Sequence, residues 1–356
     1  MEQELRFFLG ANTPNGFYSL YDELHKGLGT AEQTAGNKRP PRRIYIIKGG
    51  PGCGKSSFMR RQAKLARERG QHTEVIICSG DPGSLDAVLL PEKEIIFTDG
   101  TAPHVIEPRY PGAAEVYLDL GRFYDADALS LKRAEIQRIT DAYRAKFSLA
   151  YSWLAAAGHL YRAIRSEAAT PEFIAKAEKR ARGIIKRELP RRAQARGQIT
   201  KRFLGAFCSL GFYEMWDTAS ALCPRIYELR DSFGISSYML QPIAEAALGA
   251  GLNIIYCPDL LFPDRPEHIL IPSLGLGFVT SRPECQYRGD AYRRVRVSEM
   301  SGAGGLRALR RQALSLSETA ASVLREANEL HNELEREYNA HVDFAGVYAL
   351  AETFWE

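Results

Sequence analysis

The sequence predicts an α/β protein with a mainly parallel sheet, built twice in the chain, with helical insertions or hairpins after each copy. Three observations predict this fold. A short apolar run at 44–47 leads into a glycine-rich turn and then into a helix-like stretch at 57–69 that Gly70 can end. A segment near the N-terminus recurs in the second half of the chain. Apolar stripes at helical spacing follow each copy.

The glycine-rich turn at 49–56 reads GGPGCGKS and satisfies the phosphate-loop pattern G-x-x-x-x-G-K-[ST] between a strand and a helix. Such a turn aims backbone N–H groups and the positive end of the helix dipole at one point, which suits the β-phosphate of a nucleotide. The alternative is a glycine-rich turn that contains GKS by chance. The context favours a P-loop NTPase fold. The predicted nucleotide-binding residues are Gly49, Gly50, Pro51, Gly52, Cys53, Gly54, Lys55, Ser56 and Ser57.

Two side chains of the loop and one beyond it predict a magnesium nucleotide. Lys55 would reach the β- and γ-phosphates, and the Ser56 hydroxyl would hold Mg²⁺. The segment 94–98, with apolar residues at 95–97, is followed directly by Asp99, where such sites place a second acidic group near the metal. An ordinary aspartate in a turn is the alternative for Asp99. The expected cofactors are ATP and Mg²⁺.

Polar residues after two of the predicted strands are candidates for catalysis. Asp81 follows the run at 75–78 and would polarise water or an acceptor hydroxyl, with an Asp-Pro-Gly turn as the alternative. Asp86 is a lesser candidate in the same segment. Residues 104, 107 and 109 would assist proton transfer or touch phosphate, and structural roles are their alternative. No Glu follows Asp99 directly, so the sequence does not identify a water-activating residue. The predicted catalytic residues are Lys55, Asp81 and Asp99; the further candidates are His104, Glu107 and Arg109.

The chain repeats itself. Residues 8–22 are echoed without a gap by 203–217, with eight of fifteen positions identical. In the second copy the segment expected opposite the phosphate loop, 230–237, reads RDSFGISS. Three of the four glycines and the lysine are gone, and Asp231 would repel a phosphate. We therefore expect one intact nucleotide site per chain. The second copy would be a structural pseudo-domain, a partner that closes the first site, or a regulatory module.

The repeat and the helical stripes predict four consecutive parts. These are an intact phosphate-loop unit at 1–129, a basic helical connector at 130–195, a degenerate second unit at 196–300 and C-terminal helices at 301–356. The helical stripes are expected to pack against each other or against the sheets. Residues 24–42, rich in glycine and proline, are expected to form a loop before the nucleotide-binding strand.

Composition limits the class of protein. The 356 residues are 45% hydrophobic and 25% charged, as in soluble globular proteins. No apolar run approaches the ~18 residues that cross a bilayer, and the acidic N-terminus lacks the pattern of a secretory signal. We therefore expect a cytoplasmic protein without a membrane partner. Six scattered cysteines without a C-x-x-C pair predict reduced thiols. Cys53, at a helix N-terminus, is either a reactive thiol of lowered pKa or a small loop filler.

Charge suggests one further surface. The net charge of +4 does not favour a nucleic-acid partner, although it does not exclude one. Residues 162–202 contain thirteen Lys or Arg against four Glu. This stretch predicts either a solvated helical face or a surface for an acidic or phosphorylated partner.

Absent motifs narrow the nucleotide class. No N-K-x-D segment follows a strand to read guanine, which favours ATP over GTP, and no L-S-G-G-Q-like segment of transporter ATPases occurs. The phosphate loop, the DGTAPH segment at 99–104 and the GFY segment at 16–18 together resemble a poorly characterised bacterial family of P-loop ATPases or nucleotide-kinase-like proteins with tandem P-loop units. The resemblance covers nearly the whole chain and implies the fold and ATP binding. The chain differs from that family in lacking a second intact loop.

Three functions remain open at this point. The first is an ATPase whose hydrolysis of Mg·ATP changes the relation between the two halves. The second is a small-molecule or nucleotide kinase with an acceptor near Asp81, His104 or the basic helices. The third is a nucleotide-responsive interaction protein with little turnover.

Overall fold

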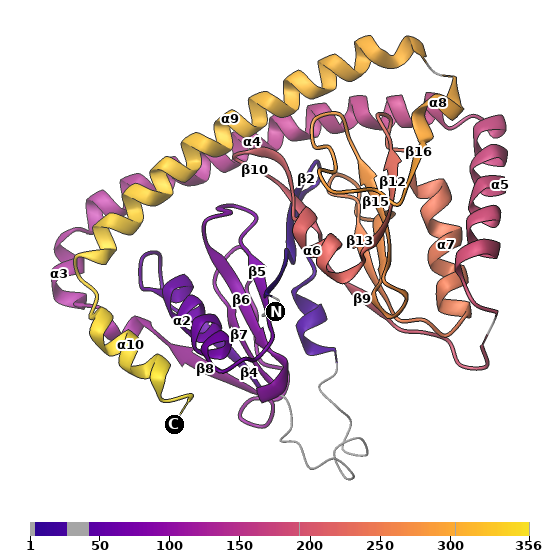
Figure 1. Ribbon diagram of the computed structural model, residues 1–356. Coiled ribbons are helices and arrows are strands. Elements are labelled where there is room, and N and C mark those ends of the chain that lie inside the picture. Colours follow the sequence, from indigo (N-terminus) through magenta and orange to yellow (C-terminus); the bar gives the residue numbers. More distant parts are fainter. Residues whose placement is uncertain (1–3, 27–42, 192, 303, 356) are drawn as a thin grey trace. The chain divides into compact units, whose positions relative to one another are not determined.

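The chain folds into two compact units that are not contiguous in sequence. The computed structural model describes residues 4–26, 43–191, 193–302 and 304–355 (Figure 1). Unit 1 comprises residues 1–10, 19–148 and 323–356, and unit 2 comprises 11–18 and 149–322. This division differs from the four consecutive parts expected from the sequence. Two long helices each have one part in unit 1 and the other in unit 2, and residues 11–18 near the N-terminus belong to unit 2. Most of the loop expected at 24–42 lies outside the described residues.

Unit 1 contains a six-stranded mixed sheet in the order β1-β5-β6-β7-β4-β8. Only β6 runs antiparallel to its neighbours, and the remaining pairs are parallel. The strand that precedes the phosphate loop, β4, therefore lies between two parallel partners in the interior of the sheet. The strands of this sheet are β1 (Glu4–Phe7), β5 (Thr73–Ile77), β6 (Leu85–Leu90), β7 (Ile95–Asp99), β4 (Arg43–Lys48) and β8 (Glu115–Asp119).

Helix α2 (Lys55–Glu68) follows the phosphate loop and buries Phe58 against the sheet. Gly70, at φ +69°, lies just beyond its end, as expected from the sequence. The C-terminal segment after α10 (Phe344–Glu352) completes this core, because Phe354 packs edge-on against Phe97 at a centroid distance of 4.9 Å. The C-terminus is thus part of the unit that carries the loop.

Unit 2 repeats the same topology. Its six-stranded sheet has the order β16-β12-β15-β14-β13-β9, and β14 is its antiparallel strand, as β6 is in unit 1. The α/β class, the mostly parallel pairing and the repetition of the sheet agree with the prediction from the sequence. The strands are β16 (Arg293–Arg296), β12 (Arg225–Arg230), β15 (Leu276–Ser281), β14 (Pro266–Ile271), β13 (Ile254–Pro258) and β9 (Ile199–Lys201).

The recurring N-terminal segment forms a hairpin each time it occurs. One hairpin is β2 (Gly10–Thr13) with β3 (Gly16–Ser19), and the other is β10 (Gly205–Cys208) with β11 (Gly211–Glu214). Within unit 2 the Asn12 amide donates to the Phe207 carbonyl at 2.8 Å. The first hairpin therefore packs in unit 2, although most of its own sequence copy is in unit 1.

Two long helices, α4 (Arg133–Ala168) and α9 (Arg307–Asn339), contribute to both units. They run side by side (Figure 1), and in unit 1 Arg138 pairs with Glu333 at 3.1 Å while Tyr143 packs on His331. In unit 2 the Ser317 hydroxyl donates to Tyr161. The two helices that carry the apolar stripes thus contact each other within each unit, and the packing of the stripes themselves stays a prediction. None of the helices in the described ranges could span a membrane.

The shorter helices complete the two units. In unit 2, α5 and α7 pack together over the sheet and bury an apolar core that includes Phe173, Ile243 and Phe278. The remaining α-helices are α3 (Ala126–Leu131), α5 (Pro171–Glu188), α6 (Trp216–Leu222), α7 (Ser237–Gly249) and α8 (Val297–Ser301). The 3-10 helices are η1 (Tyr21–His25), η2 (Pro91–Lys93), η3 (Gly121–Phe123), η4 (Pro272–Leu274) and η5 (Gly304–Leu306).

Candidate functional site

The predicted phosphate loop connects the interior strand β4 to the first residue of α2. Gly54 precedes the helix with φ +86°, a left-handed conformation that favours glycine. The loop therefore places the N-terminus of a fourteen-residue helix at the carboxyl end of β4. Strand, loop and helix follow one another as the sequence predicts.

Lys55 lies over the loop that precedes it. Its Nζ donates to the carbonyls of Gly49 and Gly50 at 2.9 and 2.8 Å, and lies 3.7 Å from Asp99 Oδ2. Asp99 reaches this position because β7 pairs in parallel with β4, with Ile47 opposite Asp99. The structure thus brings the predicted lysine and the predicted acidic group together.

Ser56 and Asp99 both offer oxygen to a cation. Asp99 Oδ1 accepts from the amide and the hydroxyl of Thr101, at 2.8 and 2.6 Å, which fixes the carboxylate and leaves Oδ2 toward Lys55. The Ser56 hydroxyl accepts from the Leu85 amide at 3.0 Å and from Arg60 at 3.4 Å, a distance at the edge of hydrogen bonding. A carboxylate and a hydroxyl are oxygen ligands that suit Mg²⁺. Mg²⁺ at these two residues stays a prediction.

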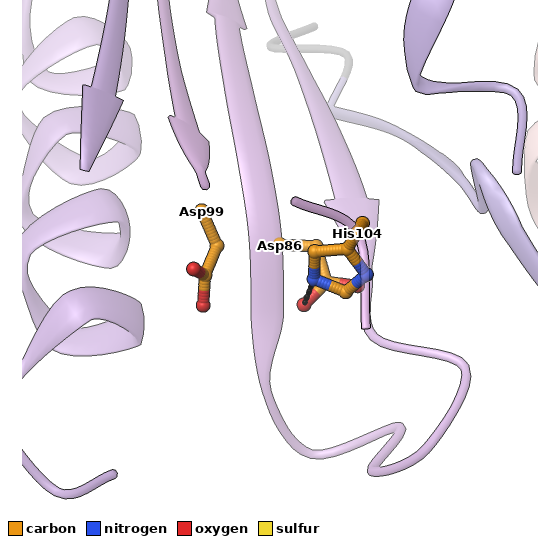
Figure 2. Close-up of side chains that lie close together, drawn as sticks. All are labelled: Asp86, Asp99 and His104. Atoms are coloured by element: carbon orange, nitrogen blue, oxygen red, sulfur yellow. Dashed lines mark ion pairs between the residues drawn. The ribbon is translucent and has the colours of Figure 1, made fainter. Parts of the chain in front are cut away.

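A buried chain of polar side chains lies next to Asp99. Tyr21 donates its hydroxyl to Asp86 Oδ2 at 2.6 Å, and His104 Nε2 lies 3.6 Å from Asp86 Oδ1 (Figure 2). The Tyr21 and His104 rings stack at 4.5 Å, and potential ligand atoms of Asp86, Asp99 and His104 lie within 4.8 Å of one another. Burial raises the pKa of the Asp86 carboxyl and that of the Tyr21 phenol.

The sequence pointed to His104, and to Asp86 as a lesser candidate, but not to Tyr21. Tyr21 lies far from the others along the chain, in the repeated N-terminal segment. Its place in the site follows from the hydrogen bond that joins η1 to Asp86 of β6, which no local pattern shows. The repeat is the only sequence signal that could have drawn attention to it.

Asp81 is held within its own turn. Its carboxylate accepts from the Gly83 amide at 3.0 Å and from the Ser84 hydroxyl at 2.6 Å. This is the arrangement of the structural alternative named for Asp81. The turn is tied to α2, since Arg60 donates to the Gly83 carbonyl.

The two remaining candidates pair with nearby side chains of unit 1. Glu107 accepts from Lys48 at 3.0 Å and from the Tyr117 hydroxyl. Arg109 donates to Asp22 at 2.6 Å. Their observed partners support structural roles.

The C-terminal helices cover the outer side of the loop. The Asn339 amide, oriented to donate, lies 2.6 Å from the Gly52 carbonyl, and the Tyr124 hydroxyl donates to Pro51 O at 3.1 Å. A Cβ on Gly52 would lie 2.7 Å from the Glu335 carbonyl of α9. No local sequence pattern predicts this contact, because more than 280 residues separate the loop from Asn339.

Cys53 is a buried thiol rather than an activated one. It is 1% exposed, and burial raises its pKa despite opposing effects of Lys55 and Tyr124. Of the two alternatives for Cys53, the lowered pKa is therefore wrong, because desolvation outweighs the helix N-terminus. All six cysteines are free, as predicted.

The basic stretch at 162–202 covers the end of α4, all of α5 and the segment beyond it. Helix α5 buries Phe173, Ala177 and Ile184 toward the core. Its Lys and Arg side chains lie exposed on the other faces: Lys176, Lys179, Arg180, Arg182, Lys186 and Arg187. This is the amphipathic arrangement of a solvated helical face, and an acidic or phosphorylated partner stays a prediction.

The degenerate loop is displaced by one residue from its expected position. Because β12 ends at Arg230 as β4 ends at Lys48, the loop at 231–236 is equivalent to 49–54. Ser237 then takes the position of Lys55, as the first residue of the following helix. Leu229 pairs with Thr280 as Ile47 pairs with Asp99, so Thr280 replaces the acidic group.

Comparisons with protein-family models, curated proteins and solved structures give no match to this chain. The family resemblance suggested by the sequence motifs therefore stays a prediction.

Substitutions of Gly52 and Gly70 test whether helix α9 packs closely against the predicted phosphate loop. Both have φ near +70°, but a Cβ meets nothing within 4 Å at Gly70 and meets α9 at Gly52. We expect Gly70→Ala to cost roughly 1 kcal/mol of unfolding free energy, and Gly52→Ala about 3 kcal/mol or more because strain and overpacking add. Urea unfolding followed by circular dichroism measures both. Equal losses would mean that α9 does not press on the loop.

Cys53 should react slowly with alkylating reagents in the folded protein. Because its pKa is raised, less thiolate forms at pH 7.5 than in a free cysteine, and burial limits access. Iodoacetamide labelling quantified by mass spectrometry should give slower modification of Cys53 than in the same protein unfolded in guanidinium. Faster labelling of Cys53 in the folded state would contradict the assignment.

Proposed function

We propose that unit 1 binds Mg·ATP at the loop 49–56 and hydrolyses it as a P-loop ATPase. The observation that carries the proposal is the placement of Lys55 beside Asp99, over the loop and at the N-terminus of α2. A helix N-terminus and a cation suit phosphate, and a nearby carboxylate suits the accompanying metal. ATP is preferred over GTP because the chain lacks the guanine-reading segment.

Each residue of the site has a distinct task in this proposal. The loop amides and the Lys55 ammonium would bind and orient the phosphates, and Lys55 would exchange its contacts with the Gly49 and Gly50 carbonyls for phosphate oxygens. Ser56 and Asp99 would hold Mg²⁺, which, when bound, neutralises charge that develops on the transferred phosphoryl group. Thr101 would keep the Asp99 carboxylate in place through its two hydrogen bonds.

The buried chain of Tyr21, Asp86 and His104 supports the reaction from beside Asp99. Asp86 is 4% exposed and His104 is 7% exposed. These buried side chains would exclude water from one side of the Asp99 carboxylate, which would bind the metal. Asp81 is engaged in its own turn. Among the described residues, the chain thus offers phosphate and metal binding more clearly than a base for an acceptor, which favours hydrolysis over a kinase reaction.

Lys55→Ala should weaken ATP binding by about 100-fold, which corresponds to ~2.7 kcal/mol, because the loop loses its cation. Isothermal titration with ATP and a non-hydrolysable analogue measures the affinity, and phosphate release measures turnover. Lys64→Ala, on the same helix but 57% exposed, is the matched control and should bind as the wild type does. Unchanged affinity in Lys55→Ala would overturn the assignment of the loop.

Asp99→Asn should remove the benefit of Mg²⁺ while leaving the loop intact. We expect the variant to bind ATP with the same affinity in magnesium and in EDTA, whereas the wild type binds more tightly with magnesium. Hydrolysis should fall in parallel. If Asp99→Asn keeps the full magnesium dependence, another group holds the metal.

The same assay separates the three functions. ADP release with water alone is expected for the ATPase, while ATP consumption that requires an added metabolite would instead indicate a kinase. ATP binding without turnover under either condition would indicate a nucleotide-responsive interaction protein. We expect a stoichiometry of one nucleotide per chain.

A further inference from the structure

We infer that the degenerate loop of unit 2 carries its own anion: the carboxylate of Asp231 occupies the place where a phosphate would bind, and removing it opens a site for inorganic phosphate. This inference concerns unit 2 and does not depend on ATP binding by unit 1.

The inference starts from the hydrogen bonds of Asp231. Its Oδ1 accepts from the amides of Phe233 and Gly234 at 2.8 and 3.1 Å, and its Oδ2 accepts from the amide of Ser236 at 2.5 Å. Three amides of one loop thus point at one carboxylate, which is 2% exposed. Oxygen atoms of a phosphate would make contacts of the same kind.

The position of the loop in the fold gives the second part of the argument. Residues 231–236 connect β12 to the thirteen-residue helix α7, as 49–54 connect β4 to α2. Asp231 is equivalent to Gly49, which has no side chain that could fold back into its loop. The fold thus builds the same anion-binding turn twice, and in unit 2 the first residue of the turn supplies the negative charge.

A cavity beside the loop is the third observation. A space of about 30 Å³ is lined by Asp231 and its loop, and also by Arg265 and Arg282. This is larger than the ~10–15 Å³ that a single water needs. Asp259 and Glu284 line it as well, so the cavity is bounded by both guanidinium groups and carboxylates.

The arginines around the cavity pair with carboxylates other than Asp231. Arg282 pairs with Glu267 and, at 3.5 Å, with Asp259; Arg265 also pairs with Asp259 at 3.5 Å. Arg310 pairs with Glu284 and donates to the Ser232 carbonyl. In these contacts the guanidinium groups share other carboxylates, while Asp231 is bound by amides and by the Ser298 hydroxyl at 3.3 Å. Removing its carboxylate leaves the three amides of the loop without their acceptor, which is a setting for an anion.

Unit 2 also contains a cluster of side chains that could hold a metal ion, but the hydrogen bonds of its histidine do not favour a metal. Glu214, Glu267 and His268 place potential ligand atoms within 4.8 Å of one another. However, His268 Nδ1 accepts from the Thr280 amide at 3.0 Å, so the proton of a neutral ring lies on Nε2, the nitrogen that faces Glu214. Metal-binding histidines instead donate from their second nitrogen. In this cluster His268 therefore presents an N–H, and not a lone pair, to Glu214.

The test is phosphate rescue of Asp231→Ala, made in a Lys55→Ala background so that the loop of unit 1 does not respond. We expect the melting temperature to fall by several degrees, and we expect inorganic phosphate to restore it in a saturable manner. The Asp231→Asn variant is the matched control, since it keeps a side-chain oxygen in the loop; it should be less destabilised and should not respond to phosphate. The parent Lys55→Ala protein should show no phosphate-dependent shift.

Hydrogen exchange locates the effect. Peptides that cover 232–240 should exchange faster in Asp231→Ala, and phosphate should slow them again, whereas peptides that cover the loop of unit 1 should not change. If phosphate stabilises Asp231→Ala no more than the parent protein, the inference is wrong. If Asp231→Ala is insoluble without phosphate, it should become soluble when prepared in phosphate, and insolubility in both buffers would equally overturn the inference.

Failure of this test and failure of the ATP assignment are distinguishable. The ATP assignment depends on titration of protein with an intact Asp231, and the phosphate test is read in protein that lacks Lys55. Either one can succeed without the other.

Discussion

The structure depends on one constraint, which is that a strand that turns directly into a helix leaves several backbone N–H groups pointing at one place. Buried donors of this kind need an acceptor, and the helix dipole makes a negative one favourable. The fold meets this constraint twice, once in each unit, after the equivalent strands β4 and β12. In each unit an acidic side chain lies near this local excess of positive charge: Asp231 in unit 2 and Asp99 in unit 1.

The two units respond in different ways. In unit 2, Asp231 supplies the charge from within, and the Asp99 position becomes Thr280. In unit 1, Gly49 has no side chain that could supply a negative charge. Lys55 adds a further positive charge, and Asp99 Oδ2 lies 3.7 Å from the Lys55 ammonium. The loop of unit 1 thus has an added cation and no carboxylate of its own, although Asp99 of β7 lies beside it. This contrast between two copies of one fold is a second argument, besides the motif, for the proposed nucleotide site.

The sequence predicted what is local and what repeats. The strand at 44–47, the loop, the helix ending before Gly70 and the strand-ending Asp99 all follow from short patterns, because neighbouring residues determine turn chemistry and helix caps. The repeat predicted two similar sheets, and the structure has them. The sequence could not predict the contact of Asn339 with Gly52 or that of Tyr21 with Asp86, because each joins residues far apart in the chain through packing. The sequence also placed the degenerate loop one residue early. The correct register follows from the strand ends, Lys48 in β4 and Arg230 in β12.

Cys53 shows why local patterns misjudge chemistry even where they place a residue well. A helix N-terminus lowers the pKa of an exposed thiol, but the loop folds Cys53 inward and desolvation then dominates. The same reasoning applies to Asp81, whose position at a strand end suggests catalysis while its turn already uses both carboxylate oxygens. In both cases the fold decides whether a reactive side chain faces a ligand or satisfies its own backbone. Lys55 and Asp99 also bond to their own turns, but the parallel pairing of β4 with β7 in addition brings these two residues, which lie far apart in the sequence, within 3.7 Å of each other.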